Sequence, residues 1–298
     1  MDLQYSTAAL AHLPVSRSFA FARELGLVGV EVALTPLLYN RGPARLGRLA
    51  ERSGVPVRSL DLSGLGDMAL DPTLIVGFAA FATALPECRV ITLPTPRATS
   101  SLNEYLSTLQ RYSEELGDHA AVTIINAPGN ATEQGPLDRF PQLRRIVEEW
   151  ELGYTFDTSH AASNGWVITE PLPQMGVRLR NVHLSDFRQA PAVGPGAQPP
   201  LLPGIPRDAQ LRRAPGEGVL PLRAFLRALQ RREYDGLLTL DLREVGWRAW
   251  WPPALQQRLS AAVTFCREAL VSYEPQRGEQ ARPPHQTPAE AENEGRAT

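Results

Sequence analysis

The chain has 298 residues, of which 43% are hydrophobic, and its formal net charge is −2 at pH 7. This length fits one large barrel or two modest domains, and the near-neutral charge argues against a surface that binds polyanions. All 30 basic residues are arginine, so the sequence excludes a Schiff-base lysine or a phosphate-loop lysine.

Cysteine usage and the amino terminus indicate the compartment. Cys88 and Cys266 lie far apart and lack metal-type spacing, which predicts a reduced intracellular setting. The first residues, 1–4, contain no basic region followed by an apolar run, and no run of about 18 apolar residues occurs in the chain. We therefore expect a cytoplasmic protein without a secretory signal or a membrane span.

Short β-prone runs alternate with helical segments along the chain. We expect strands at 3–6, 29–34, 57–62, 89–93, 121–125, 154–157, 181–184 and 236–242. Helices are expected at 16–25, 43–52, 71–85, 101–116, 140–150, 222–230 and 253–271, several of them with a glycine just past the end. Prolines interrupt the segment 171–176, so any helix there should be short or irregular.

Eight strands that alternate with helices predict an α/β fold, a single-domain (β/α)8 barrel over residues 1–272 with a disordered polar tail at 273–298. A doubly wound sheet is the competing architecture, and it would usually carry a glycine-rich turn after the first strand. The residues at 6–9 are Ser-Thr-Ala-Ala, which favours the barrel. The loop at 187–218 is long, and long loops at this face of a barrel tend to be lids or specificity elements.

Polar side chains end several of the expected strands. Because side chains alternate along a strand, Asn126, Asp157, His183 and Asp241 can all point inward at the carboxyl-terminal rim. Oxygen and nitrogen donors from neighbouring strands predict a divalent-metal site. Taken singly, an Asp or Asn after a strand is more often a turn former or a helix N-cap. Taken together, the four favour metal or substrate binding, since polar groups at this rim are usually functional.

Four motifs occur in a characteristic order: FDTSHA at 156–161, NVHLSD at 181–186, APGEGVLPL at 214–222 and YDGLLTLDLRE at 234–244. In this order and spacing the sequence resembles the xylose isomerase-like barrel superfamily, which includes sugar-phosphate isomerases and epimerases, inosose dehydratases and endonuclease IV. The resemblance extends to about Val271. It implies a metal site for Mn²⁺, Mg²⁺, Co²⁺ or Zn²⁺, held by a Glu, an Asp, a His and a Glu after strands five to eight.

Two of the four implied metal ligands depart from the pattern of that superfamily. Asp157 and His183 match it, whereas Asn126 and Asp241 stand where glutamate is usual, so the ligands would total −2 instead of −3. Asp241 also reaches less far than Glu by roughly 1.5 Å, one carbon–carbon bond, against metal–oxygen distances of about 2.0–2.6 Å. A divalent metal stays the expected cofactor, and the alternatives are a shifted site, water in the gap, or a site that holds the metal weakly or has lost it.

The resemblance also implies catalytic roles for Asp241, Asp157 and His160. In the epimerases two glutamates act as acid and base on opposite faces of the substrate carbon. Asn126 cannot transfer a proton, which conflicts with an ordinary two-base epimerase. Asp241 can remain a base.

Substrate binding is assigned by the same resemblance to His160 and Asp186, and by side-chain chemistry to Arg188 and Arg243. Arginine suits planar anions, so these two side chains can bind a carboxylate or phosphate. The alternatives are a hydrogen-bonded residue at a helix start for His160 and rim salt bridges for the two arginines.

The leading hypothesis is a sugar phosphate isomerase/epimerase-like enzyme that acts on a small polyol, keto-sugar or hydroxy acid by metal-assisted proton transfer. It would have a small-molecule substrate and no membrane or nucleic-acid partner, and homo-oligomerisation stays open. The alternative is a catalytically degenerate barrel that binds a ligand or partner without turnover. Endonuclease IV-like DNA repair is disfavoured because the chain has only 5 histidines, too few for a three-zinc cluster.

Overall fold

The computed structural model describes residues 1–10, 13–95, 102–128, 140–188, 212–242 and 251–271. The predicted tail at 273–298, most of the predicted loop at 187–218, and Arg243 lie outside the described residues.

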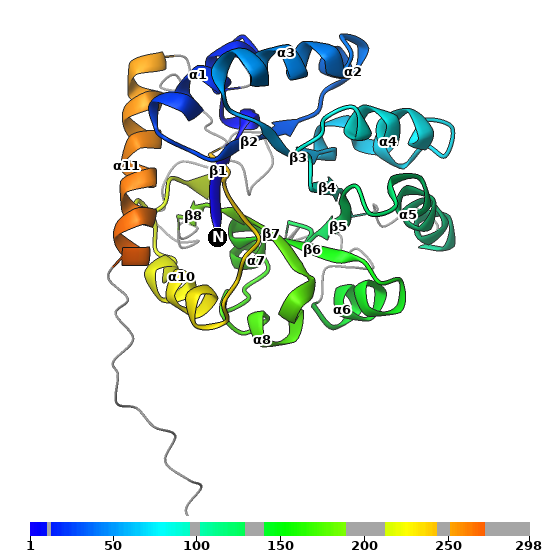
Figure 1. Ribbon diagram of the computed structural model, residues 1–298. Helices are drawn as coiled ribbons and strands as arrows, with labels where there is room; N and C mark the ends of the chain where they lie inside the picture. Colours follow the sequence, from blue (N-terminus) through cyan, green and yellow to red (C-terminus); the bar gives the residue numbers. More distant parts are fainter. Residues whose placement is uncertain (11–12, 96–101, 129–139, 189–211, 243–250, 272–298) are drawn as a thin grey trace, which may run out of the picture.

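Eight parallel strands close into a barrel (Figure 1). They are β1 (Asp2–Ser6), β2 (Gly29–Ala33), β3 (Val57–Asp61), β4 (Val90–Leu93), β5 (Ala121–Ile125), β6 (Gly153–Asp157), β7 (Leu179–Leu184) and β10 (Leu237–Leu240). The order around the barrel is β1-β10-β7-β6-β5-β4-β3-β2. Closure depends on β1, which places Asp2 opposite Leu237 of β10 and Gln4 opposite Gly29 of β2. The predicted (β/α)8 barrel is confirmed.

Helices follow the strands and surround the barrel (Figure 1). The α-helices are α1 (Val15–Glu24), α2 (Pro36–Asn40), α3 (Pro43–Ser53), α4 (Ile75–Thr83), α5 (Leu102–Leu116), α6 (Phe140–Glu149), α7 (Thr158–Ser163), α8 (Leu172–Met175), α10 (Leu222–Arg231) and α11 (Pro252–Val271). Three 3-10 helices are η1 (Thr7–Leu10), η2 (Ser63–Leu70) and η3 (Gly176–Arg178). None of the described helices is both long and apolar enough to span a bilayer.

The helices differ from the predictions at a few places. The helix expected from 71 begins at Ile75, because the chain first forms η2, within which Gly66 takes a φ of 55° that no regular helix contains. The helices α2 and α7 were not predicted from the sequence. The helix α7 is only 6 residues long and begins directly after Asp157, whose side chain caps it. The proline-interrupted segment forms only the 4-residue helix α8, as expected.

The apolar core lies between the barrel and its helices. Phe156 of β6 and Phe225 of α10 are both fully buried, and their rings stack with centroids 5.9 Å apart. Aromatic pairs of this kind add to the free energy gained by removing apolar area from water. This contact fixes α10 against the strand that carries Asp157.

The interior of the barrel, in contrast to the core between the barrel and the helices, contains buried polar side chains. Thr155 of β6 lies 2.8 Å from the hydroxyl of Thr92 and 2.7 Å from that of Thr123, so three neighbouring strands share one hydroxyl cluster. All three threonines are buried. Buried polar groups cost free energy unless they are hydrogen-bonded, and here hydroxyl groups on adjacent strands bond to one another.

We predict that Phe156→Ala lowers the free energy of unfolding by about 3–5 kcal/mol, since it removes a ring from a filled core. Phe156→Leu is the matched control and should cost clearly less. Chemical denaturation followed by far-ultraviolet circular dichroism measures both. Equal, small losses in the two variants would show that this contact does not hold α10 in place.

Candidate functional site

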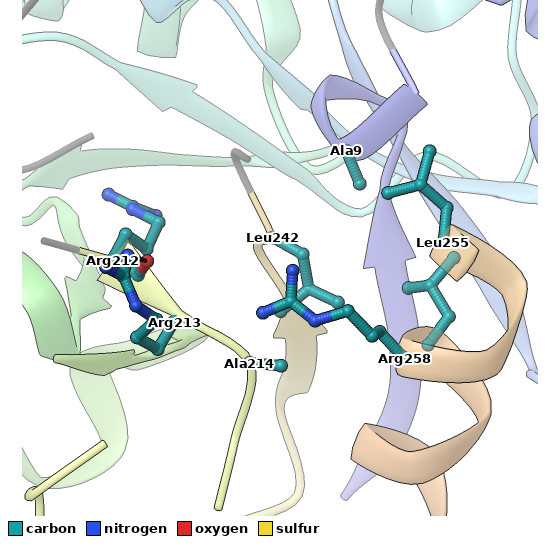
Figure 2. Close-up of a pocket in the computed structure, with 8 residues that line it drawn as sticks. Ala9, Arg212, Arg213, Ala214, Leu242, Leu255 and Arg258 are labelled. Carbon is teal, nitrogen blue, oxygen red and sulfur yellow. Dashed lines mark hydrogen bonds between the residues drawn. The ribbon is translucent and has the colours of Figure 1, made fainter. Parts of the chain in front are cut away.

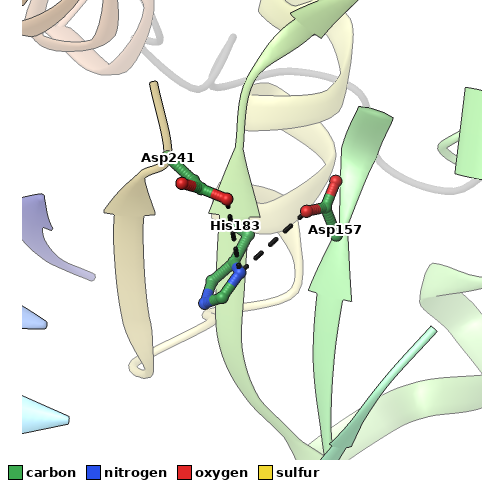
Figure 3. Close-up of side chains that lie close together, drawn as sticks. All are labelled: Asp157, His183 and Asp241. Carbon is green, nitrogen blue, oxygen red and sulfur yellow. Dashed lines mark ion pairs between the residues drawn. The ribbon is translucent and has the colours of Figure 1, made fainter. Parts of the chain in front are cut away.

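The carboxyl ends of β6, β7 and β10 bring Asp157, His183 and Asp241 together (Figure 3). One potential ligand atom from each lies within 4.8 Å of the others, and all three side chains are fully buried. Asp241 follows the last residue of β10 directly, and Asp157 lies opposite His183 in the β6–β7 register. The structure thus brings together three of the four residues predicted to bind metal. By spacing alone, these three could hold a cation.

The two oxygens of Asp157 have separate tasks. Its Oδ1 caps α7 by accepting hydrogen bonds from the backbone N–H of Ser159 at 2.8 Å and of His160 at 2.9 Å. Its Oδ2 faces the centre of the site, 4.0 Å from Nδ1 of His183. The structure therefore shows Asp157 as a helix cap, and its role as a site carboxylate stays a prediction.

His183 is oriented by a carboxylate that the sequence analysis missed. Glu31 of β2 accepts a hydrogen bond at Oε2 from Nε2 of His183, 3.0 Å away, across the barrel interior. The other ring nitrogen, Nδ1, has no hydrogen-bond partner among the described residues, and it lies 3.9 Å from Oδ2 of Asp241. Glu31 therefore fixes which nitrogen of His183 faces the site.

Glu31 is itself held by a buried polar network. Its Oε2 also accepts hydrogen bonds from the hydroxyl of Ser59 at 3.0 Å and from the amide of Asn181 at 2.9 Å. Gln4 joins Ser59 to Thr239 with two 2.8 Å hydrogen bonds. The charged residue inside the apolar strand GVEVA is the sequence signal that could have identified Glu31, since charges are rarely buried without partners.

A fourth charged group, Arg212, stands over the three residues. It comes from β9 (Arg212–Arg213), which pairs antiparallel with β8 (Asp186–Phe187) just past the end of β7. Its guanidinium donates to Oδ2 of Asp157 at 2.9 Å and to Oδ2 of Asp241 at shorter range. The side chain is only 1% exposed. Arg212 is not among the site residues predicted from the sequence.

These charges set the protonation states. Burial alone would raise the pKa of Asp157. The nearby positive charges of Arg212, His160 and His183 together lower it by more, so the pKa falls below the usual range and the carboxylate is ionised. Burial would lower the pKa of His183, whereas Glu31 and then Asp241 raise it, to about 9. At neutral pH the ring is therefore an imidazolium with Nδ1–H directed at two carboxylates.

A divalent ion does not fit this arrangement as it stands. The natural ligand atoms are Nδ1 of His183 and the Oδ2 atoms of the two aspartates, and Arg212 already bonds to both of those oxygens. Asn126, the fourth predicted ligand, uses its amide elsewhere. Its oxygen accepts from the Asp157 N–H at 2.7 Å, and its nitrogen donates to the Asp157 carbonyl at 3.0 Å.

His160 lies beside the cluster and has a defined tautomer. Its Nδ1 is 2.7 Å from the carbonyl oxygen of Asn126. Because a carbonyl only accepts, Nδ1 carries the proton. Nε2 faces Oδ2 of Asp157 at 3.7 Å, and the side chain is 10% exposed, more than the other members of the cluster. His160 is thus the member best placed to exchange a proton with a ligand.

The side chain of Asp186 has a structural role, because it binds backbone N–H groups of nearby segments. Its carboxylate accepts hydrogen bonds from the backbone N–H of Phe187 at 2.8 Å, Gly216 at 3.1 Å and Leu220 at 2.9 Å. It thereby holds the PGEG segment, 215–218, against β8. A Cβ on Gly218 would lie 2.3 Å from Oδ1 of Asp186, which explains the glycine. Substrate binding by Asp186 stays a prediction, as does that by Arg188, which is exposed at the end of a described range.

A cavity opens next to Arg212 (Figure 2). Arg212, Arg213 and Arg258 line it together with apolar side chains that include Leu242 and Leu255. Burial and the neighbouring charges of Arg188 and Arg258 lower the pKa of Arg213, whereas Glu217 raises it. Arg258 is itself paired with Glu217, its Nε donating to Oε1 at 2.9 Å. Within the described part of the chain, the cavity joins the charged cluster to a wall of leucines.

The fold and the rim of polar groups define the class of protein: a parallel (β/α)8 barrel with ionisable side chains at the carboxyl ends of its strands. The family model described as "Xylose isomerase-like TIM barrel" matches residues 19–265, and the chain belongs to this family. No curated protein sequence matches the chain.

Solved structures agree with this assignment. A xylose isomerase domain protein from Alicyclobacillus acidocaldarius superposes with a TM-score of 0.68 at 18% identity, covering 91% of this chain and 98% of that one. D-psicose 3-epimerase with D-tagatose from Clostridium cellulolyticum H10 gives 0.67 at 14% identity, covering 91% and 99%. The IolI protein with a bound zinc atom gives 0.63 at 15% identity, covering 91% and 97%. At these identities the likeness shows the fold alone.

The raised pKa of His183 predicts how stability depends on pH. In the unfolded chain the pKa is near 6.5, and in the folded protein it is about 9. Between these values the folded state binds the extra proton, so the free energy of unfolding should fall as pH rises, by up to roughly 3 kcal/mol at about 1.4 kcal/mol per pH unit.

Urea denaturation at pH 6.5, 7.5, 8.5 and 9 tests this prediction, with Glu31→Gln as the comparison. The variant loses the main group that raises the pKa of His183, so its stability should change less with pH over the same range. Parallel pH profiles for wild type and variant would contradict the assignment of the proton to the His183–Glu31 pair.

Proposed function

We propose that this protein is an isomerase or epimerase that moves a proton next to the carbonyl of a small hydroxylated compound carrying an anionic group. A sugar phosphate or a hydroxy acid has that chemistry. The observation that carries the proposal is the convergence of two aspartates, two histidines and Arg212 at the carboxyl rim of the barrel, beside an arginine-lined cavity. The D-psicose 3-epimerase that shares the fold supports the reaction class.

Proton transfer needs a base and a donor on the same substrate. Asp241 supplies a carboxylate, and His160 supplies Nε2, the nitrogen that its hydrogen bond to the Asn126 carbonyl leaves facing the site. The imidazolium of His183 and the guanidinium of Arg212 place positive charge where an enediolate oxygen would develop. Fixed donors in a site that excludes water stabilise such charge strongly.

Recognition of the anionic group falls to the cavity. Arg213 and Arg258 face it beside Leu242 and Leu255 (Figure 2). Arginine binds carboxylate and phosphate oxygens in pairs, and the leucines can cover the carbon skeleton. A carboxylate or phosphate matches the positive charge of Arg213 better than a neutral sugar does, which is why an anionic substrate fits better.

Solvent exchange tests the proposed reaction. A panel of keto- and aldose phosphates and 2- and 3-hydroxy acids is incubated with the protein in D₂O, and nuclear magnetic resonance follows deuterium at the carbon next to the carbonyl. We expect exchange with an anionic member. Asp241→Asn and His160→Gln should each slow it by about 100-fold or more, the usual contribution of an acid–base group.

Two arginine variants separate binding from chemistry in that assay. Arg213→Ala should raise KM with little change in kcat, because it removes a contact to the anionic group. Arg231→Ala, which changes an exposed arginine at the end of α10, is the matched control and should behave as wild type. Identical behaviour of the two variants would remove the cavity from substrate recognition.

A second candidate function is ligand binding without turnover. Asn126 favours it, because the residue holds the backbone of Asp157 and offers no titratable group where the resemblance places an acid. On this proposal, members of the panel raise the melting temperature but exchange no deuterium. That pair of results would replace the enzyme with a binding barrel.

A further inference from the structure

The position of Arg212 has a consequence for metal binding that does not depend on the proposed reaction. The guanidinium bonds to Oδ2 of Asp157 and Oδ2 of Asp241, which are the oxygens that flank Nδ1 of His183 at 4.0 Å and 3.9 Å. A cation is therefore already part of the cluster, and the chain itself supplies it.

Arg212 and a divalent ion would compete for the same atoms. A metal bound to Nδ1 of His183 and to both Oδ2 atoms would have ligand distances of about 2.0–2.6 Å. The guanidinium nitrogen Nη2 lies 2.9 Å from Oδ2 of Asp157, so ion and guanidinium would be adjacent like charges among buried side chains. Such an arrangement is strongly unfavourable, and one of the two cations has to leave.

The surrounding structure keeps Arg212 in place. Arg212 as a whole is only 3% exposed. Its strand, β9, pairs with β8, so that Arg212 lies opposite Phe187 and Arg213 opposite Asp186. Asp186 in turn binds the backbone of Gly216 and Leu220 on the far side of β9. Withdrawal of the guanidinium would leave two buried carboxylates without their common partner, which costs several kcal/mol.

We propose that Arg212 is the resident cation of this barrel and that it excludes divalent metal from the cluster formed by Asp157, His183 and Asp241. The cluster is then a latent metal site, with three possible ligand residues in place and closed by a side chain of the same chain. Removal of the guanidinium alone should open it.

Metal binding by wild type and Arg212→Ala tests the proposal directly. Each protein is treated with chelator, dialysed and titrated with Zn²⁺ and Mn²⁺ by calorimetry, and bound metal is counted by elemental mass spectrometry. We expect wild type to bind no stoichiometric metal. Arg212→Ala should bind about one equivalent of Zn²⁺ at least 100-fold more tightly than wild type, and saturating Zn²⁺ should raise its melting temperature by several degrees.

Further variants identify the ligands and guard against misfolding. Arg212→Ala/His183→Ala should lose the acquired site, whereas Arg231→Ala should bind metal no better than wild type. Arg212→Gln keeps one hydrogen bond to a carboxylate without the charge, so it serves where Arg212→Ala does not fold, and it should also gain metal affinity.

Three results would overturn the proposal. The first is stoichiometric metal on wild type that His183→Ala removes, since this requires an open site beside Arg212. The second is a folded Arg212→Ala or Arg212→Gln protein with no gain in affinity, since something other than the guanidinium would then block the metal. The third is a gain that survives in Arg212→Ala/His183→Ala. None of these depends on whether the protein turns over a substrate, so failure here and failure of the proposed reaction are distinguishable.

Discussion

The burial of charge inside the barrel is the constraint on which the site depends. Glu31, Asp157, His183 and Asp241 are all fully buried, and Arg212 is nearly so. An isolated buried ion costs several kcal/mol, so each of these groups has to be paired. Three carboxylates meet two cations here. The hydrogen bond between Glu31 and His183 crosses the barrel interior between β2 and β7, which are not neighbours in the sheet.

This pairing couples the site to the loop that covers it. Asp186 holds Gly216 and Leu220, that segment follows β9, and β9 presents Arg212 to the two aspartates. The glycine at 218 is needed because Asp186 occupies the space of a side chain there. Changes in the PGEG segment should therefore alter the charge cluster without touching it. Effects of substitutions along this route will not be additive, because they share partners.

The sequence predicted the barrel and part of the site. The strand periodicity and helix ends gave the strands to within a few residues, and the rule that rim residues converge placed Asp157, His183 and Asp241 together. Glu31 was not predicted, because the alternation of side chains was applied only to residues at the ends of later strands. The same rule applied to β2, where a charge interrupts an apolar run, points Glu31 into the barrel.

Arg212 was beyond such rules. It lies 29 residues after His183 in the sequence. Its position depends on the antiparallel pairing of β8 with β9, two strands of two residues each, which are too short to show a periodic pattern in the sequence. Asn126 shows a similar limit. Its spacing predicts an inward side chain, but only the tertiary structure shows that the amide bridges to the backbone of Asp157.

A guanidinium carries one positive charge where a divalent metal carries two, so the two aspartates are balanced only with the imidazolium of His183, and the chemistry of the centre changes. Two aspartates need a cation nearby, and either kind of cation satisfies that need. A guanidinium donates hydrogen bonds in fixed directions and keeps its protons at any physiological pH, so it can orient an oxyanion but cannot generate a bound hydroxide. Proton transfer must then fall to titratable neighbours. His160 is the most exposed of these in the cluster, and its tautomer is fixed by the carbonyl of Asn126. Asn126 has a part in this arrangement through its backbone, because its carbonyl binds Nδ1 of His160 and leaves Nε2 towards Asp157.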